Sequence, residues 1–148
     1  MTKNKQDLRY AGPPGITFGD ITRRTSGSAE QKIIHNRQIV YTHKGRGALG
    51  LLCRHWNLKP GDELLMPAYN CGSEVDPFVQ YDLKVIFYRV NQQAQIDLRD
   101  LQSRVTAKTR VIYVTHYFGW PQDIQFLSEY CRDNNLYLLE DCALSLFS

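Results

Sequence analysis

The stretch Leu136-Tyr137-Leu138-Leu139-Glu140-Asp141 is an apolar run that ends in two acids. Uninterrupted apolar runs of this length are typical of strands buried on both faces of a parallel sheet. The carboxyl ends of such strands open onto the crevice in which α/β proteins bind ligands. Because a carboxylate loses hydration there, it needs a cationic partner. Asp141 is therefore a candidate binding residue, and a protonated pyridine ring is one cation that it would hold.

Four other segments predict strands, at 38–42, 63–66, 84–88 and 110–115. Together with the strand at 136–140, the last three of these begin at residues 63, 84, 110 and 136. This spacing leaves room for a helix and two loops between successive strands. Helices are predicted at about 48–56, at 73–81, from an Asp97 cap to about residue 105, and from Pro121 to about residue 133. Right-handed βαβ units follow, so we expect an α/β fold with a mostly parallel sheet and flanking helices.

The bulk composition fits one globular domain, with 148 residues, 43% apolar and 22% charged. No apolar run approaches the roughly 20 residues of a membrane span. The four cysteines lack CxxC spacing, and the first residues lack the apolar segment of a secretory signal. These features predict reduced thiols in a cytoplasmic protein. Residues 1–37, rich in Gly, Pro, Thr and Arg, form a predicted loop-rich lead-in to the sheet domain at 38–148.

Charge is unevenly distributed, because residues 1–46 hold nine lysines and arginines against three acids. A basic leader of this kind raises the possibility of a nucleic-acid-binding arm. Its basic residues are scattered without aromatic side chains between them, so we interpret it as a solvated segment near an anion site.

Three of the turns between predicted elements carry residues that suit a ligand. Gly45-Arg46-Gly47 lies between a strand and a helix, where free N–H groups and the helix dipole attract phosphate. Tyr69 and His116 each follow a strand, and would face a flat ring or donate a hydrogen bond. Structural roles are commoner for each residue alone, but their position with Asp141 at one sheet edge favours a binding site.

A family resemblance rests on five motifs in this order. They are Gly45-Arg46-Gly47-Ala48-Leu49, Pro60-Gly61-Asp62-Glu63, Pro67-Ala68-Tyr69, His116-Tyr117-Phe118-Gly119 and Glu140-Asp141-Cys142-Ala143. The order resembles the DegT/DnrJ/StrS family of sugar aminotransferases, which depend on pyridoxal 5'-phosphate and have the type I aminotransferase fold. The resemblance implies amino transfer, typically from glutamate, to a nucleotide-linked keto-sugar, by a homodimer without nucleic-acid or membrane partners.

The resemblance also implies residue roles. Gly45 and Arg46 stand where the family's backbone amides hold the cofactor phosphate, Asp141 where its Asp pairs with the pyridine nitrogen, and Tyr69 and Cys71 in the loop that covers the ring. Arg46 replaces the family's usual Thr, and Cys71 replaces a stacking aromatic in many members. Leu144 occupies a position that is usually Gln or His. His116 and Leu144 are further candidates, and no metal ligand is expected.

The family's Schiff-base lysine lies in a segment beyond the position of Asp141, whereas Lys44, Lys59, Lys84 and Lys108 lie in other segments. We therefore expect this chain to be the N-terminal part of the large domain, from a truncated reading frame or partial gene, and inactive by itself. Two alternatives remain: a non-catalytic regulatory module that binds pyridoxal phosphate or a nucleotide-sugar, and an unrelated α/β nucleotide-binding protein.

Overall fold

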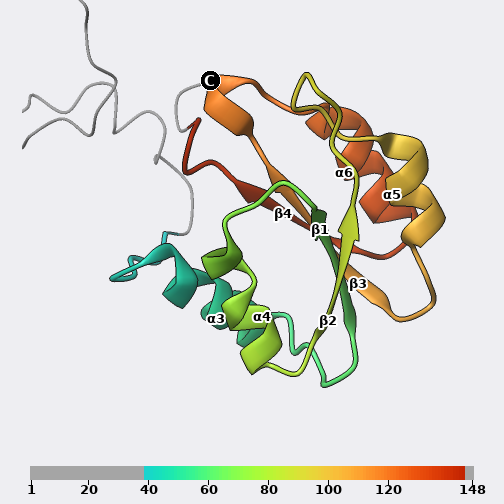
Figure 1. Cartoon of the computed structure of the whole chain (residues 1–148). Coiled ribbons are helices and arrows are strands. Elements are labelled where there is room, and N and C mark those ends of the chain that lie inside the picture. The colour runs from blue at the N-terminus through green and yellow to red at the C-terminus, as the bar shows by residue number, and fades with distance from the viewer. Residues whose placement is uncertain (1–38, 146–148) are drawn as a thin grey trace, which may run out of the picture. The chain divides into compact units, whose positions relative to one another are not determined.

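Strand β1 (Glu63–Pro67) is at the centre of the sheet, and all five of its residues are buried. It pairs in parallel with β2 (Lys84–Tyr88) on one side and with β3 (Thr109–Thr115) on the other, and β3 pairs in parallel with β4 (Tyr137–Asp141). The strand order is β2-β1-β3-β4 in this computed structural model, which describes residues 39–145 (Figure 1). The prediction of an α/β fold with a parallel sheet is confirmed.

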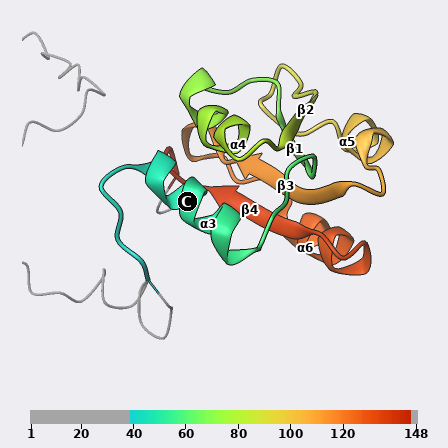
Figure 2. The ribbon, with the colours of Figure 1, turned by 90° about the horizontal axis from the view of Figure 1, so that it is seen from below.

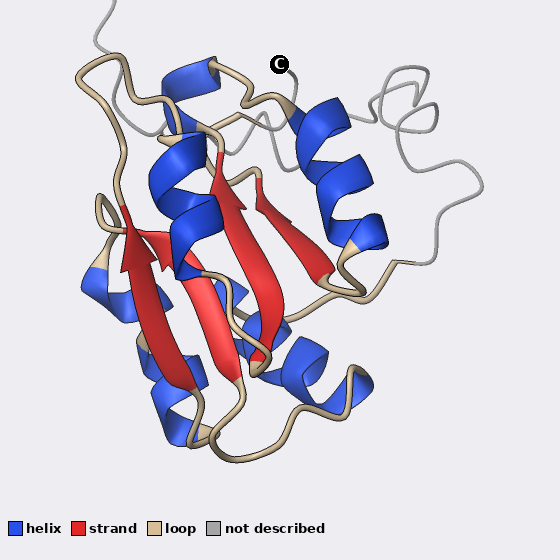
Figure 3. Cartoon of the chain, turned by 90° about the vertical axis from the view of Figure 1, so that its right-hand side faces the viewer, coloured by secondary structure: helices blue, strands red, loops and turns tan. Residues whose placement is uncertain are grey.

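Helices cover both faces of the sheet (Figures 2 and 3). Helices α3 (Gly45–His55) and α4 (Asp76–Gln80) pack on one face, and α5 (Leu98–Arg104) and α6 (Ile124–Asp133) pack on the other. Two short 3-10 helices, η1 (Gly72–Glu74) and η2 (Tyr117–Gly119), follow β1 and β3 at their carboxyl ends.

Alternation along β1 divides the core in two, because successive side chains of a strand point to opposite faces. Leu64 and Met66 belong to the cluster under α3 and α4, which includes Cys53 of α3. Leu65 belongs to the cluster under α5 and α6, which includes Cys131 of α6. All four cysteines are free thiols.

Aspartates cap the two helices of the second face. Asp97 accepts a hydrogen bond from the Asp100 N–H at 3.1 Å, which confirms the predicted start of α5. Asp123 accepts one from the Phe126 N–H at 3.1 Å. Helix α6 therefore begins at Ile124, and the prediction that Pro121 opens it is wrong, because the cap lies two residues after the proline.

The predicted strand at 38–42 is absent from the described part of it, residues 39–42. Tyr41 is 85% exposed there, and a strand without a ladder partner leaves its backbone groups to water. The predicted turn at 44–47 is instead the first turn of α3, which begins at Gly45. The predicted lead-in at 1–37 lies outside the described residues.

Strand β4 is the edge of the sheet next to α3. The rings of Trp56, just after α3, and Tyr137 stack with centroids 4.6 Å apart and planes 5° from parallel. This stack attaches the edge strand to the first helical layer. Within residues 39–145, no helix combines the length and apolarity that crossing a membrane requires.

Candidate functional site

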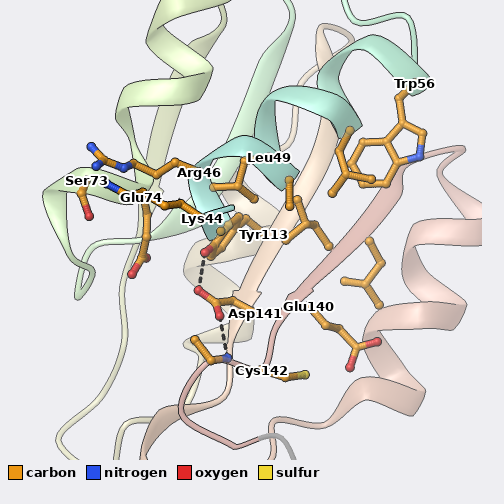
Figure 4. A pocket seen from close by; sticks show the side chains of 16 residues that line it. Lys44, Arg46, Leu49, Trp56, Ser73, Glu74, Tyr113, Glu140, Asp141 and Cys142 are labelled. Carbon is orange, nitrogen blue, oxygen red and sulfur yellow. Dashed lines mark hydrogen bonds between the residues drawn. The ribbon is translucent and has the colours of Figure 1, made fainter. Parts of the chain in front are cut away.

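A cavity of about 590 Å³ lies between the start of α3 and the carboxyl end of β4 (Figure 4). Its volume is in the range of small-molecule sites. The predicted residues Gly45, Arg46 and Asp141 all line it, although about a hundred residues of sequence separate the turn from the acid. These residues meet because β4 is the edge strand next to α3, and its carboxyl end lies beside the start of that helix.

The start of α3 carries positive charge that its own sequence does not balance. Its N-cap, Lys44, has extended backbone angles and makes no side-chain capping bond, and the first turn has no acid. The first N–H groups of a helix lack intrahelical acceptors and form the positive end of its dipole. Among the described residues, Arg46 forms an ion pair with the half-exposed Asp76 at 3.8 Å, which is a weak pair in water. This end of the cavity suits an anion.

Gly45 keeps the backbone at this helix end open. Apart from its chain neighbours and the backbone of its own helix, a β-carbon built on Gly45 would meet no atom of the described residues within 4 Å, so the space beside it is open. Since Gly45 lines the cavity, a bound group can approach the first peptide units of the helix closely.

The Asp141 carboxylate is held from two sides. Its Oδ2 accepts a hydrogen bond from the Tyr113 hydroxyl at 2.5 Å, and its Oδ1 accepts one from the Ala143 N–H at 2.8 Å (Figure 4). Burial, and then this hydrogen bond, raise the pKa of Tyr113, so the phenol keeps its proton and remains a donor. The arrangement orients an anionic carboxylate in the cavity.

Glu74 of η1 is a second acid in the cavity. Its Oε2 is buried and has no hydrogen-bond partner within the described part of the chain. Burial and then the charge of Asp141 raise the pKa of Glu74. Figure 4 shows its side chain extending toward the same region as Tyr113 and Asp141.

Sequence reasoning did not single out Glu74 or Tyr113. Tyr113 lies in an apolar strand, where a tyrosine is usually core, and Glu74 lies in a loop, where an acid is usually solvated. The available signal was the hydroxyl inside an otherwise apolar run, two residues before the strand end at Thr115.

His116, which follows β3, is buried and bonded at both ring nitrogens. Its Nδ1 accepts the Gln122 N–H at 3.1 Å, and its Nε2 lies 3.1 Å from Glu140 Oε2. His116, Glu140 and Cys142 place atoms that could bind a metal within 4.8 Å of one another. Because Nδ1 accepts, the neutral ring carries its proton on Nε2, which leaves no lone pair toward a cation. Burial also raises the pKa of the Cys142 thiol, which disfavours the thiolate that a metal would need. The cluster of His116, Glu140 and Cys142 therefore favours a hydrogen bond between His116 and Glu140 over a bound metal.

The other predicted residues lie outside this cavity. Tyr69 is 58% exposed, packs on Tyr117 with centroids 5.3 Å apart, and lines a separate hollow beside Phe118. The Cys71 Sγ is exposed, 3.1 Å from Ser73 Oγ. Leu144 is exposed after β4.

Comparisons with known proteins give one consistent result. The model of the DegT/DnrJ/EryC1/StrS aminotransferase family matches residues 27–148. GDP-perosamine synthase of Vibrio cholerae is 30% identical over 100 residues, which are 67% of this chain and 27% of that protein.

Two solved structures share the fold. The E. coli GDP-4-keto-6-deoxy-D-mannose-3-dehydratase with bound hydrated PLP has a TM-score of 0.67 and 26% identity, over 76% of this chain and 31% of that one. Ntda from Bacillus subtilis with bound cofactor PMP has a TM-score of 0.72 and 24% identity, over 78% of this chain and 27% of that one. The chain thus spans about a third or less of the length of these proteins.

Proposed function

This chain belongs to the DegT/DnrJ/EryC1/StrS aminotransferase family, and on that premise we propose that its cavity binds pyridoxal 5'-phosphate for amino transfer to a nucleotide-linked keto-sugar. The observation that carries the proposal is the pairing of two complementary charges across one cavity. An unbalanced positive helix end lines one side, and the oriented Asp141 carboxylate lines another. A phosphorylated pyridine carries the matching charges on one molecule.

The phosphate would lie at the start of α3. Gly45 and Arg46 would offer backbone N–H groups, and the Lys44 and Arg46 side chains would add charge at the same helix end. Binding there would satisfy the helix dipole that no acid of the first turn satisfies.

Asp141 would hold the ring nitrogen in its protonated form. The bound cofactor supplies an electron sink, and a protonated nitrogen strengthens it. Asp141 is suited to this role because Tyr113 and the Ala143 N–H fix both of its oxygens before any ligand arrives.

The finer features of the proposal come from the family. We extend to the whole protein a homodimeric state, a cytoplasmic location, glutamate as amino donor, and a sugar-nucleotide substrate of the kind named for its relatives. Tyr69 and Cys71 belong to the loop proposed to cover the ring, and His116 and Leu144 remain candidate neighbours. His116 supports the site through its contact with Glu140.

Binding of pyridoxamine phosphate tests the cofactor site, because this amine form does not react with the chain's lysines. Gly45→Val fills the open space above the helix end, and we expect affinity to fall at least about thirtyfold, or about 2 kcal/mol. Gly50→Val is the matched control, since Gly50 lies on the same helix, a β-carbon built on it makes only an ordinary contact with Tyr81 at 3.8 Å, and it does not line the cavity. Equal affinity in both variants would remove the phosphate assignment.

Amino transfer is tested by grafting residues 41–145 into the matching region of the Vibrio cholerae synthase and measuring formation of GDP-perosamine. We expect the graft to retain activity and Asp141→Ala to lower it by at least about a hundredfold, because a neutral ring nitrogen weakens the electron sink. A drop of less than about tenfold would show that another group performs this role.

A further inference from the structure

Tyr113 connects two acids that come from different elements. It lies on β3, donates to Asp141 at the end of β4, and shares the cavity with Glu74 of η1. Figure 4 shows the Glu74 and Asp141 side chains extending toward the same part of the cavity, and the Asp141 charge contributes to the raised pKa of Glu74, as expected for like charges that lie near each other.

Within the described part of the chain, neither Glu74 nor Asp141 forms an ion pair with a basic side chain. Over residues 39–145, the ion pairs involve other acids, such as Glu63 with Lys84 and Asp100 with Arg104. The other charged side chains that line the cavity are Lys44, Arg46 and Glu140, and Glu140 faces His116. Glu74 also keeps one buried oxygen without a hydrogen bond. The cavity lining thus carries three acids, Glu74, Glu140 and Asp141, against two cations, Lys44 and Arg46.

We infer that Tyr113 and Glu74 are positioning residues that act on a bound ring through Asp141: Tyr113 fixes the direction of its carboxylate, and Glu74 adds negative charge that favours a protonated ring nitrogen. The inference rests on the proposed function, because it takes the cofactor as the ligand. A cation beside Asp141 would relieve the repulsion between the two acids, whereas a neutral ring would leave it in place.

The charge preference is measured with two ligands, pyridoxamine phosphate and its 1-deaza analogue, which has carbon in place of the ring nitrogen. The native chain is expected to prefer the nitrogen ligand at least about tenfold, since a hydrogen bond between charged groups is stronger than a neutral contact. Glu74→Gln should reduce this preference about fivefold, because it removes charge and keeps shape. Glu129→Gln, an exposed acid on α6, is the control and should keep the native preference.

The role of Tyr113 is measured by a double-mutant cycle. Tyr113→Phe keeps the ring that packs on Phe78 and removes only the hydroxyl, so the fold should be retained. We expect pyridoxamine phosphate to bind about tenfold more weakly in this variant. In an Asp141→Ala background, which has no acceptor for the Tyr113 hydroxyl, the same change should have no further effect, because Tyr113 acts through the Asp141 carboxylate. Tyr81→Phe, whose hydroxyl meets Arg54 instead, is the control.

The coupling between Glu74 and Asp141 can also be measured without a ligand. Titration of the Glu74 carboxyl by carbon-13 NMR should show a lower pKa in Asp141→Asn than in the native chain, because a like charge has been removed. If the native chain binds neither ligand, the proposed function fails, and an unmoved Glu74 pKa would then reject the coupling as well. If the chain binds pyridoxamine phosphate but Glu74→Gln keeps the native preference, or the cycle is additive, the inference fails and the proposed function stands.

Discussion

Asp100 and Glu74 lie on opposite faces of the sheet and differ in how completely their carboxyl groups are hydrogen-bonded and paired with charge. Asp100, a buried residue of α5, receives two hydrogen bonds from Arg104, at 2.7 and 3.0 Å, and one from the Arg89 N–H at 2.8 Å. Glu74, on the α3 face, has a buried oxygen with no partner and a like charge nearby. The difference is the one we expect if Asp100 stabilises the fold and Glu74 is placed for a ligand, as inferred above.

The pKa values of the two acids move in opposite directions for this reason. The Arg104 hydrogen bonds, with those of Arg89, lower the pKa of Asp100 from 3.8 to about 2. Burial and Asp141 raise the pKa of Glu74 above its usual 4.5. Because a pKa shift between folded and unfolded states changes stability with pH, the two acids should give pH dependences of opposite sign.

The largest expected effect is the loss of stability when Asp100, the fully paired acid, is replaced. Asp100→Asn removes the charge and most of its hydrogen bonds to Arg104 and Arg89, and we expect the free energy of unfolding at pH 7 to fall by about 2 kcal/mol. Urea denaturation measures this change. Asp133→Asn, whose side chain is 67% exposed beside an exposed Arg132, is the control and should change stability by less than about 0.5 kcal/mol. Equal effects in the two variants would contradict the comparison.

A second prediction concerns the pH dependence of that loss. The lowered pKa of Asp100 means that its stabilising charge is fully present above about pH 4 and disappears as the pH falls toward 2. The difference between the native chain and Asp100→Asn should therefore shrink over this range. A difference that stays constant from pH 7 to pH 3 and below would show that the charge is not responsible.

The smallest expected effect has the opposite sign. Glu74→Gln should raise the free energy of unfolding by about 0.5–1 kcal/mol at pH 7, because it removes a charge that is poorly solvated and repelled by Asp141. Since the folded state binds the Glu74 proton more tightly than the unfolded state, this gain should disappear as the pH falls below 4.5, where both states are protonated. A destabilised variant at pH 7 would mean that Glu74 supports the fold.

Local patterns in the sequence were sufficient where backbone chemistry decides structure. The strand at 84–88 and the Asp97 cap were predicted to the residue, because an apolar run and a side-chain cap act locally. The segment at 38–42 has the same apolar character, but its described residues, 39–42, form no strand, and a single sequence does not show whether a strand has a partner.

The candidate site divides in the same way. Gly45, Arg46 and Asp141 were predicted from rules about strand ends and helix starts, and all three line the cavity. Glu74 and Tyr113 were not predicted, because their interactions with Asp141 join three elements that are distant in sequence. Glu74 of η1, Tyr113 of β3 and Asp141 of β4 line the same cavity, and no local motif encodes that meeting.

The stack of Trp56 on Tyr137 has a consequence for observing this molecule. The chain has two tryptophans, and the other, Trp120, is 72% exposed. Trp56 is half-buried and lines the cavity. Its ring stacks on Tyr137 of β4, the edge strand that carries Asp141. The indole emission of the protein therefore has a solvent-exposed component that serves as an internal reference and a shielded component that reports on the cavity. Ligand entry and detachment of the edge strand both change the second component, so their kinetics are measurable optically without an attached dye.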